Sequence, residues 1–263
     1  MDAGRVASIG WTSTVNAPAY LDRIRYKGPT TPNAETLRSL HRAHMFTVPF
    51  ENLDIGLGRK ITCDENRFLH KIVDERRGGF CYEMNGAFAA LLRELGFQVT
   101  LLSARVSGGD GNYGLEFDHL TLRVELEQDW LADVGFGDSF VDPLRLEPSL
   151  EQEQFGRRYR ITSGKNRFHL EAHADDAWKQ QYEFTLHPRE LSEFAGMCHY
   201  HQTSPDSHFT RKWICSLATP EGRITLTGDK LIETRNGVRE EWVLQGDEEW
   251  RAVLRDRFGV SLP

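Results

Sequence analysis

Residues 78–96 read Gly78-Gly79-Phe80-Cys81-Tyr82-Glu83-Met84-Asn85-Gly86-Ala87-Phe88-Ala89-Ala90-Leu91-Leu92-Arg93-Glu94-Leu95-Gly96. The glycine pair interrupts the preceding segment, and apolar side chains then recur at helical spacing from Met84 to Leu95. Gly96 suits the position just after a helix, where a left-handed backbone is common. The stretch therefore predicts a helix with one apolar stripe, in which Cys81 lies one or two residues from the start.

Outward from this stretch, helical and extended patterns occupy different parts of the chain. Before it, helices are expected over 34–44, after the start signal Pro32-Asn33, and over 68–73. After Phe97, alternating or short apolar runs predict strands, and a helix closes the chain over 247–258. The expected strands cover 99–102, 119–126, 130–134, 159–161, 168–172, 181–186, 213–217 and 223–226. Helices first and strands later predict an α+β fold rather than a wound parallel sheet.

The composition excludes several classes of function. The 263-residue chain has a net charge of −7 and no long run of Lys or Arg, which argues against nucleic acid or an anionic membrane as a partner. No apolar run approaches the roughly 18 residues of a transmembrane helix. The segment Met1–Arg5 lacks the apolar region of a secretory signal, so we predict a cytoplasmic protein.

The cysteines and glycines give no sign of a metal or nucleotide site. Cys63, Cys81, Cys198 and Cys215 contain no Cys-x-x-Cys pair, which predicts neither a disulfide framework nor a zinc site. His199, His201 and His208 near Cys198 do not have a standard zinc spacing either, and we predict no metal. The Gly-rich loop over 107–114 lacks Gly-Lys-Ser/Thr, which disfavours a phosphate-binding loop.

Cys81 is the candidate nucleophile. The unpaired N–H groups at a helix start, and the positive end of the helix dipole, favour a thiolate there. Arg76 and Arg77 lie just upstream and either add to this field or pair elsewhere. The alternative is that Cys81 is a small apolar residue that begins the stripe of Met84 and Phe88.

His119 and Asp133 are candidate partners for Cys81. Alternate residues from Leu120 to Leu126 are apolar, so His119 lies on the opposite, polar face of its strand. It is therefore either a surface histidine or a base. Asp133 interrupts the apolar run 130–134, where an unpaired carboxylate would be costly to bury. Pairing with His119 would supply the partner that this carboxylate needs.

The hairpin between these two strands tests the pairing. A loop centred on Leu126, such as residues 124–128, would place His119 directly opposite Asp133. A two-residue turn at Glu127-Gln128 would pair Asp133 with Leu122, on the wrong face. A catalytic pair therefore predicts a wide loop or a bulge around Leu126.

Several motifs, taken together, resemble the arylamine N-acetyltransferases. They follow that family's order and spacing from about residue 18 to the C-terminus. They are residues 20–24 (YLDRI), 48–54 (VPFENLD), 77–85 (RGGFCYEMN), 118–119 (DH), 133–137 (DVGFG), 204–209 (SPDSHF) and 222–226 (GRITL). Asp118 is a departure, because some relatives carry Thr before the histidine.

The resemblance implies a fold and a set of site residues. It implies a helical domain over 1–96, a β-barrel-like domain over 97–203 and a small α/β lid over 204–263, around a cysteine-protease-like Cys-His-Asp core. Cys81 would be the acylated nucleophile, His119 its base and Asp133 the group that orients the imidazole. The resemblance also places Phe50 and Phe136 in the acceptor pocket, and Gly135 and Gly137 where CoA or the acceptor passes close to the backbone.

The activity implied by the resemblance is that of an acyltransferase of xenobiotic metabolism. An acetyl group would pass from acetyl-CoA to a Cys81 thioester, and then to the nitrogen or oxygen of an arylamine, arylhydrazine or arylhydroxylamine, in a ping-pong sequence. Acetyl-CoA would be a co-substrate, with no cofactor bound permanently. Exchange between two thioesters is nearly isoenergetic, so neither a metal nor ATP is required.

Three other functions use part of the same pattern. Transglutaminase-like and cysteine-protease-like hydrolases share the order Cys, His, Asp, but the motifs around Phe50 and Phe136 favour the transferase. An amide synthase that closes a polyketide macrocycle from a carrier-bound thioester would use the same chemistry. A non-catalytic binding module is disfavoured because all three members of the triad are present.

Overall fold

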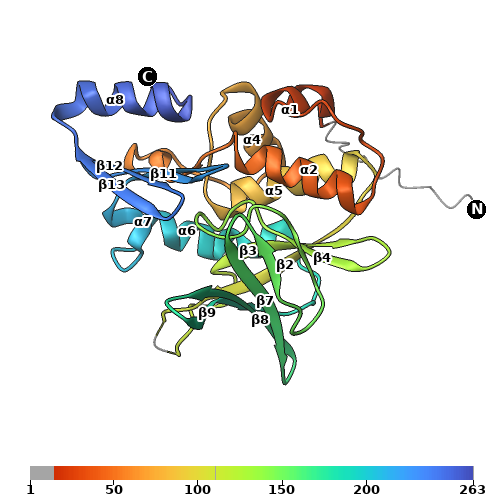
Figure 1. The fold of residues 1–263 in the computed structure, drawn as a ribbon. Helices are drawn as coiled ribbons and strands as arrows, with labels where there is room; N and C mark the ends of the chain where they lie inside the picture. Colours follow the sequence, from red (N-terminus) through yellow and green to blue (C-terminus); the bar gives the residue numbers. More distant parts are fainter. Residues whose placement is uncertain (1–14, 110, 263) are drawn as a thin grey trace, which may run out of the picture.

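Helices dominate the chain up to residue 94 and strands dominate the rest, as the sequence predicts. The computed structural model describes residues 15–109 and 111–262 (Figure 1). Residues 1–14 of the predicted helical domain, residue 110 of the predicted Gly-rich loop and residue 263 lie outside that description. Among the described residues, no helix is both long and apolar enough to cross a membrane.

The first part of the chain surrounds Cys81 with helices. Asn33 caps α2 by accepting the Thr36 N–H at 2.8 Å, in agreement with the start signal Pro32-Asn33. The helix expected over 68–73 is instead α4 continued by a π-helical turn, η1. The bounds are α1 Ala17–Arg23, α2 Ala34–Met45, α3 Leu53–Gly56, α4 Glu65–Leu69, η1 His70–Asp74 and α5 Cys81–Glu94.

Helix α5 forms the centre of this part and ends as its sequence predicts. Gly96 has φ +90°. The Gly96 and Phe97 N–H groups donate to the carbonyls of Arg93 and Leu92, which is the Schellman arrangement. The prediction of a single apolar stripe is wrong, because residues 81–92 are all buried. Helices α1 and α4 pack on this helix, and strands β2 and β3 pack on it as well.

The middle of the chain forms an eight-stranded, nearly closed antiparallel sheet. Its strand order is β5-β4-β3-β2-β9-β8-β7-β6. Every strand segment expected between residues 99 and 186 overlaps one of these strands, although most strands are longer than expected. The bounds are β2 Gln98–Val106, β3 His119–Glu125, β4 Asp129–Ala132, β5 Leu144–Arg145, β6 Gln152–Gln154, β7 Arg157–Gly164, β8 Arg167–Ala174 and β9 Ala177–Phe184.

Two glutamine side chains bridge the gap between the end strands of this sheet. The Gln152 side chain accepts the Arg145 N–H and donates to the Arg145 carbonyl, which imitates a backbone pair between β6 and β5. In the same way, the Gln154 side chain accepts the Asp142 N–H and donates to the Asp142 carbonyl. The polar edges of β5 and β6 are thereby satisfied, which removes the exposed hydrogen-bonding groups that make sheet edges prone to association.

The last part of the chain forms a second antiparallel sheet, in the order β1-β10-β11-β12-β13. Strand β1 comes from the first part of the chain and pairs Phe50 with Ser216. Helix α8 packs on this sheet through Leu254 and Phe258 (Figure 1). The bounds are β1 Phe50–Glu51, η2 Leu191–Phe194, α6 Ala195–Thr203, α7 His208–Arg211, β10 Ile214–Thr219, β11 Gly222–Thr227, β12 Lys230–Arg235, β13 Val238–Val243 and α8 Gly246–Phe258.

The hairpin β12–β13 was not expected from the sequence. Every residue of β13 is exposed, so this strand lacks the alternation of apolar and polar residues that signals a half-buried strand. The turn between the two strands did carry a signal in the sequence, the dipeptide Asn236-Gly237. Both residues have positive φ, of +49° and +82°. Asn-Gly between two short strands is typical of a two-residue hairpin turn.

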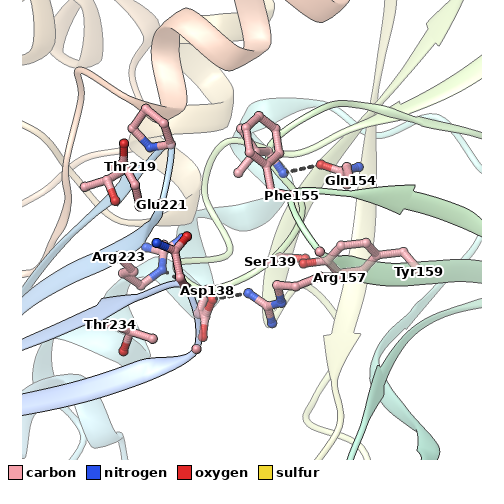
Figure 2. A pocket seen from close by; sticks show the side chains of 16 residues that line it. Asp138, Ser139, Gln154, Phe155, Arg157, Tyr159, Thr219, Glu221, Arg223 and Thr234 are labelled. Carbon is pink, nitrogen blue, oxygen red and sulfur yellow. Dashed lines mark hydrogen bonds and ion pairs between the residues drawn. The ribbon is translucent and has the colours of Figure 1, made fainter.

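The two sheets meet at Asp138 (Figure 2). One of its carboxylate oxygens lies 2.6 Å from Arg157 Nη1 of β7 and 3.3 Å from Arg223 Nε of β11. These three side chains line a cavity of about 740 Å³ between the sheets. Asp138 thus ties the loop after β4 to both sheets at once.

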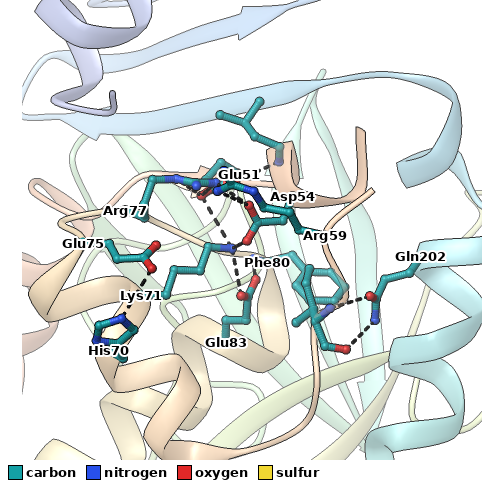
Figure 3. Close-up of polar contacts among 12 residues, drawn as sticks. Glu51, Asp54, Arg59, His70, Lys71, Glu75, Arg77, Phe80, Glu83 and Gln202 are labelled. Carbon is teal, nitrogen blue, oxygen red and sulfur yellow. Dashed lines mark hydrogen bonds and ion pairs between the residues drawn. The ribbon is translucent and has the colours of Figure 1, made fainter. Parts of the chain in front are cut away.

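A buried ionic cluster lies beneath the start of α5 (Figure 3). Lys71 Nζ is 2.8 Å from Asp54 Oδ2 and 2.8 Å from Glu83 Oε1. Arg77 Nη2 is 2.7 Å from Glu51 Oε1 and 3.1 Å from Asp54 Oδ1. Of the two possibilities for Arg77, therefore, it pairs elsewhere rather than facing Cys81. Glu83 also accepts the Phe80 N–H at 3.1 Å, which anchors the first turn of α5 to this cluster.

Replacing Lys71 by methionine is expected to lower the free energy of unfolding by about 3–5 kcal/mol, because the buried carboxylates of Asp54 and Glu83 would lose the ammonium group that lies 2.8 Å from each. Urea unfolding followed by circular dichroism would measure the loss. Lys60→Met, at an exposed lysine on the same side of the molecule, is the control and is expected to change stability by less than about 0.5 kcal/mol. A loss below about 1 kcal/mol for Lys71→Met would contradict the prediction that the cluster depends on this cation.

Candidate active site

Cys81 is the first residue of α5 and is only 4% exposed. Phe80 precedes the helix in an extended conformation, and Glu83 holds the Phe80 N–H. Cys81 and His119 line the same cavity, and His119 and the Leu120 backbone both act to lower the pKa of the Cys81 thiol. Helix α5 and strand β3 therefore bring the two predicted residues together.

The hairpin register is not the one that the catalytic pairing was expected to need. Strand β3 pairs Glu125 with Asp129 and Leu122 with Ala132, so the loop is residues 126–128 and is centred on Glu127. Continuing this register puts Asp133 opposite Thr121 rather than opposite His119. The expectation of a wide loop centred on Leu126 is therefore wrong.

The two side chains meet nevertheless, because they lie on the same face of the hairpin. Asp133 and His119 are diagonal neighbours, and diagonal neighbours remain within reach of long or aromatic side chains. His119 Nε2 lies 2.7 Å from Asp133 Oδ2. His119 is also buried, at 3% exposure, so the alternative of a surface histidine is wrong. The rings of Phe136 and Tyr182, with centroids 5.3 and 5.2 Å from that of His119, cover the face that the strand pattern alone had assigned to solvent.

Four donors converge on the Asp133 carboxylate. Oδ1 accepts Asn85 Nδ2–H at 2.8 Å and the Gly135 N–H at 3.0 Å. Oδ2 accepts from His119 and from the Tyr182 hydroxyl, the latter at 3.0 Å. Burial raises the pKa of Asp133, but His119 and these hydrogen bonds more than offset it, so the net pKa is lowered. The group is therefore a fixed negative charge beneath the imidazole.

This charge determines the proton on His119. Burial lowers the pKa of His119, but the Asp133 carboxylate and the contact with Cys81 raise it by more, to about 10. Because Nε2 is directed at Asp133, Nδ1 is the nitrogen left for Cys81. The pair is thus arranged to hold an imidazolium against the sulfur, as in other catalytic triads.

The sulfur itself behaves differently from what the helix start alone suggests. Full burial raises the pKa of the Cys81 thiol by more than His119 and the Leu120 N–H lower it. The sequence expectation that the helix start favours a thiolate considered only the stabilising effects, and the net direction is the opposite. An anion on this sulfur therefore depends on the imidazolium beside it.

One cavity of about 450 Å³ contains Cys81, His119 and both predicted pocket phenylalanines. Phe50 enters from β1 and Phe136 from the loop after β4. The Phe136 ring meets the His119 ring edge-on, with centroids 5.3 Å apart. Phe209 of α7 packs near Phe50, with centroids 6.1 Å apart. Flat aromatic walls therefore stand directly beside the candidate nucleophile.

Gly135 and Gly137 lie in the same loop but have different surroundings. A Cβ on Gly135 would come within 2.8 Å of the Cys81 Cα and of Asn85 Nδ2, so glycine is needed for the loop to approach α5. Gly137 has φ +94°, which favours glycine, and leads into Asp138. Their predicted contact with CoA stays a prediction.

Several residues of the site were missed from the sequence. His41 accepts the Asp133 N–H, and Tyr182 donates to its carboxylate, across separations of 92 and 49 residues. Asn85 was detectable, because it lies one helical turn after Cys81 and therefore on the same face of α5. It also accepts the Val134 N–H at 2.9 Å, which fixes the backbone next to Asp133.

The histidines near Cys198 have partners of another kind. His201 Nδ1 lies 3.2 Å from Ser207 Oγ, and its Nε2 lies 3.2 Å from Asp118 Oδ1. Across residues 15–109 and 111–262, no group of three or more His, Cys, Asp or Glu side chains is placed to hold a metal ion.

The chain is similar to known proteins over most of its length. A family model described as N-acetyltransferase (Acetyltransf_2) matches residues 33–263. The arylamine N-acetyltransferase of Escherichia coli is 35% identical over 92% of this chain and 88% of its own length. The structure of the Salmonella typhimurium arylamine N-acetyltransferase superposes with a TM-score of 0.89 at 31% identity, covering 93% of this chain and 90% of that one.

A third comparison includes a bound ligand. The structure of the Mycobacterium marinum arylamine N-acetyltransferase in complex with CoA has a TM-score of 0.86 at 33% identity, covering 93% of each chain. The family model and these relatives each cover most of the chain. On these grounds the chain belongs to the arylamine N-acetyltransferase family.

Proposed function

We propose that this protein transfers an acetyl group from acetyl-CoA to aromatic amines, hydrazines or hydroxylamines through a thioester on Cys81. The observation that carries the proposal is that Cys81 and His119 line one aromatic cavity, with His119 Nε2 2.7 Å from Asp133 Oδ2. Membership of the family supports acetyl as the group transferred. CoA in the relative from Mycobacterium marinum supports acetyl-CoA as the donor.

In the first half-reaction, the Cys81 thiolate would attack the acetyl carbonyl carbon. The new C–S bond forms as the bond to the CoA sulfur breaks, and the departing CoA thiolate takes the proton of His119. Asp133 keeps the ring oriented with Nδ1 toward the sulfur. The exchange replaces one thioester with another, so it requires no resident cofactor.

In the second half-reaction, the amine nitrogen would attack the Cys81 thioester. Neutral His119 accepts the amine proton as the C–N bond forms, and Cys81 leaves as a thiolate. The return of the imidazolium next to the sulfur stabilises this leaving group. The aromatic walls at Phe50 and Phe136 favour flat acceptors and limit the access of water to the thioester.

We also propose that the chain is divided into the three parts predicted from the sequence, 1–96, 97–203 and 204–263. One buried apolar cluster lies wholly within residues 102–184, and another draws all its members but Leu53 from residues 215–260, which supports this division. The cavity draws Cys81 from the first part, His119 from the second and Phe209 from the third, which supports an active-site cleft where the parts meet.

Mass spectrometry of the intact protein tests the proposal. After exposure to acetyl-CoA we expect a gain of about 42 Da, one acetyl group in place of one proton, mapped to Cys81 by peptide fragmentation. Adding an arylamine such as 4-chloroaniline should remove the adduct and yield the N-acetyl product. With p-nitrophenyl acetate as donor, rapid release of p-nitrophenol should require the amine. Rapid release in buffer alone, with no acetylated amine, would support the hydrolase instead.

A further inference from the structure

Asp118 directs a second carboxylate toward the cavity that contains Cys81. Its side chain is 16% exposed and lines that cavity together with His201 and His208. Oδ2 accepts the Val106 N–H at 3.2 Å, and Oδ1 lies 3.2 Å from His201 Nε2. The carboxylate is thus fixed in place, with no role in the Cys81–His119–Asp133 series.

Ser207, His201 and Asp118 resemble a further serine triad in outline, but the serine cannot act as a nucleophile. Ser207 is 3% exposed and does not line the cavity. Its hydroxyl caps α7 by accepting the Phe209 N–H at 3.3 Å. With Ser207 on one ring nitrogen and Asp118 on the other, His201 is held as a rigid part of the cavity wall.

No fixed cation balances Asp118 within the cavity. Among the described residues that line it, none is Lys or Arg. His119 is already paired with Asp133. Burial, and then the nearby His201, lower the pKa of His208 below its ordinary value, so this ring is neutral near pH 7.

Three arginines on neighbouring segments, Arg105, Arg189 and Arg211, have other partners. Arg105 donates to the Gly114 carbonyl and to Glu183. Arg211 donates to the carbonyls of Ser207 and Asp206. Arg189 pairs with Glu116 and Glu193. An acceptor with a negative charge would therefore meet the Asp118 carboxylate in a cavity whose described lining includes no Lys or Arg.

We propose that Asp118 makes the acceptor site selective for neutral or cationic aromatic amines and hydrazines over anionic ones such as aminobenzoates. The inference rests on the proposed acetyl transfer and adds the charge of the acceptor to it. The physical basis is Coulomb repulsion in a cavity partly enclosed by protein, where two like charges interact more strongly than in water.

A matched pair of acceptors tests the selectivity. 4-Aminobenzamide and 4-aminobenzoate have nearly the same shape, but only the second is charged at pH 7.5. The amide group withdraws more electron density from the ring than the carboxylate, which makes its amine the weaker nucleophile. A preference for the amide therefore cannot come from the reactivity of the acceptors and must come from the protein's acceptor site. We expect kcat/KM for the amide to exceed that for the benzoate by about tenfold or more.

Asp118→Asn is the decisive variant. The Asn carbonyl can accept the Val106 N–H, and its NH2 can donate to His201 Nε2 once that ring carries its proton on Nδ1, facing Ser207. The ratio of the two kcat/KM values is the readout, because effects on the acetylation step common to both acceptors divide out. We expect this ratio to fall at least about fivefold. Glu116→Gln removes the same charge from the same loop at a residue that does not line the cavity, and should leave the ratio unchanged.

The outcomes separate this inference from the function on which it rests. Failure to acetylate either acceptor, with no adduct on Cys81, would overturn the proposed function. Efficient transfer to both acceptors with equal kcat/KM, or a ratio that Asp118→Asn does not change, would overturn the charge selectivity alone. A ratio that falls equally in Glu116→Gln would assign the effect to the general field of the protein, and so would also overturn the role of Asp118.

Discussion

Replacing Cys81 by serine is expected to reduce acetyl transfer by a factor of about 10⁴ or more, with no acetyl adduct formed on the protein. Serine is close to cysteine in size and keeps an O–H group beside His119, but its hydroxyl is far harder to deprotonate than a thiol. The buried position makes this worse, because burial already raises the pKa of the native thiol. Single-turnover kinetics with acetyl-CoA, followed by intact-mass measurement, would give the result.

A second cysteine provides the control for this prediction. Cys63 is half-buried and does not line the cavity that contains Cys81. Cys63→Ser should therefore retain both the acetyl adduct and the turnover of the native protein. Full turnover by Cys81→Ser would contradict the assignment of Cys81 as the nucleophile. So would an acetyl adduct on Cys63 in that variant with no loss of rate.

Replacing Asp133 by asparagine is expected to lower kcat/KM by about 10³–10⁴ while Cys81 stays in place. All four groups around this carboxylate are donors: Asn85, the Gly135 N–H, His119 and Tyr182. The NH2 of an asparagine would face two of them whichever way it turned. The imidazole would lose both its orientation and the charge that raises its pKa to about 10.

Alkylation separates this loss from a general disturbance of the site. The rate at which iodoacetamide modifies Cys81 near pH 7 reports how readily the thiolate forms, and it should fall together with the transfer rate in Asp133→Asn. Asp129→Asn is the matched control, because Asp129 begins the strand that Asp133 follows but pairs with Arg123 near the surface. Transfer within tenfold of the native rate in Asp133→Asn would contradict the role of the carboxylate.

Local signals in the sequence predicted the elements that the structure contains near Cys81. Asn33 starts α2 and Gly96 ends α5, because a side-chain cap and a left-handed backbone act within a single turn of helix. The same reasoning missed β13, where full exposure removes the pattern on which a strand prediction depends. Burial was underestimated as well, since α5 and the start of β3 are covered on faces that their periodicity assigned to solvent.

The sequence by itself determined which residues are available for catalysis: a cysteine at a helix start, a histidine opening a strand and a carboxylate within an apolar run. Only the tertiary structure decided how they meet. A hairpin shifted from the expected register still joins His119 to Asp133, because the two share one face and their side chains reach diagonally across it. The hydrogen bonds that hold Asp133 in place, with Asn85, Tyr182 and His41, could not be predicted from the sequence. These contacts join residues 48, 49 and 92 positions apart, and they form only when α5, α2 and the barrel sheet pack around the carboxylate.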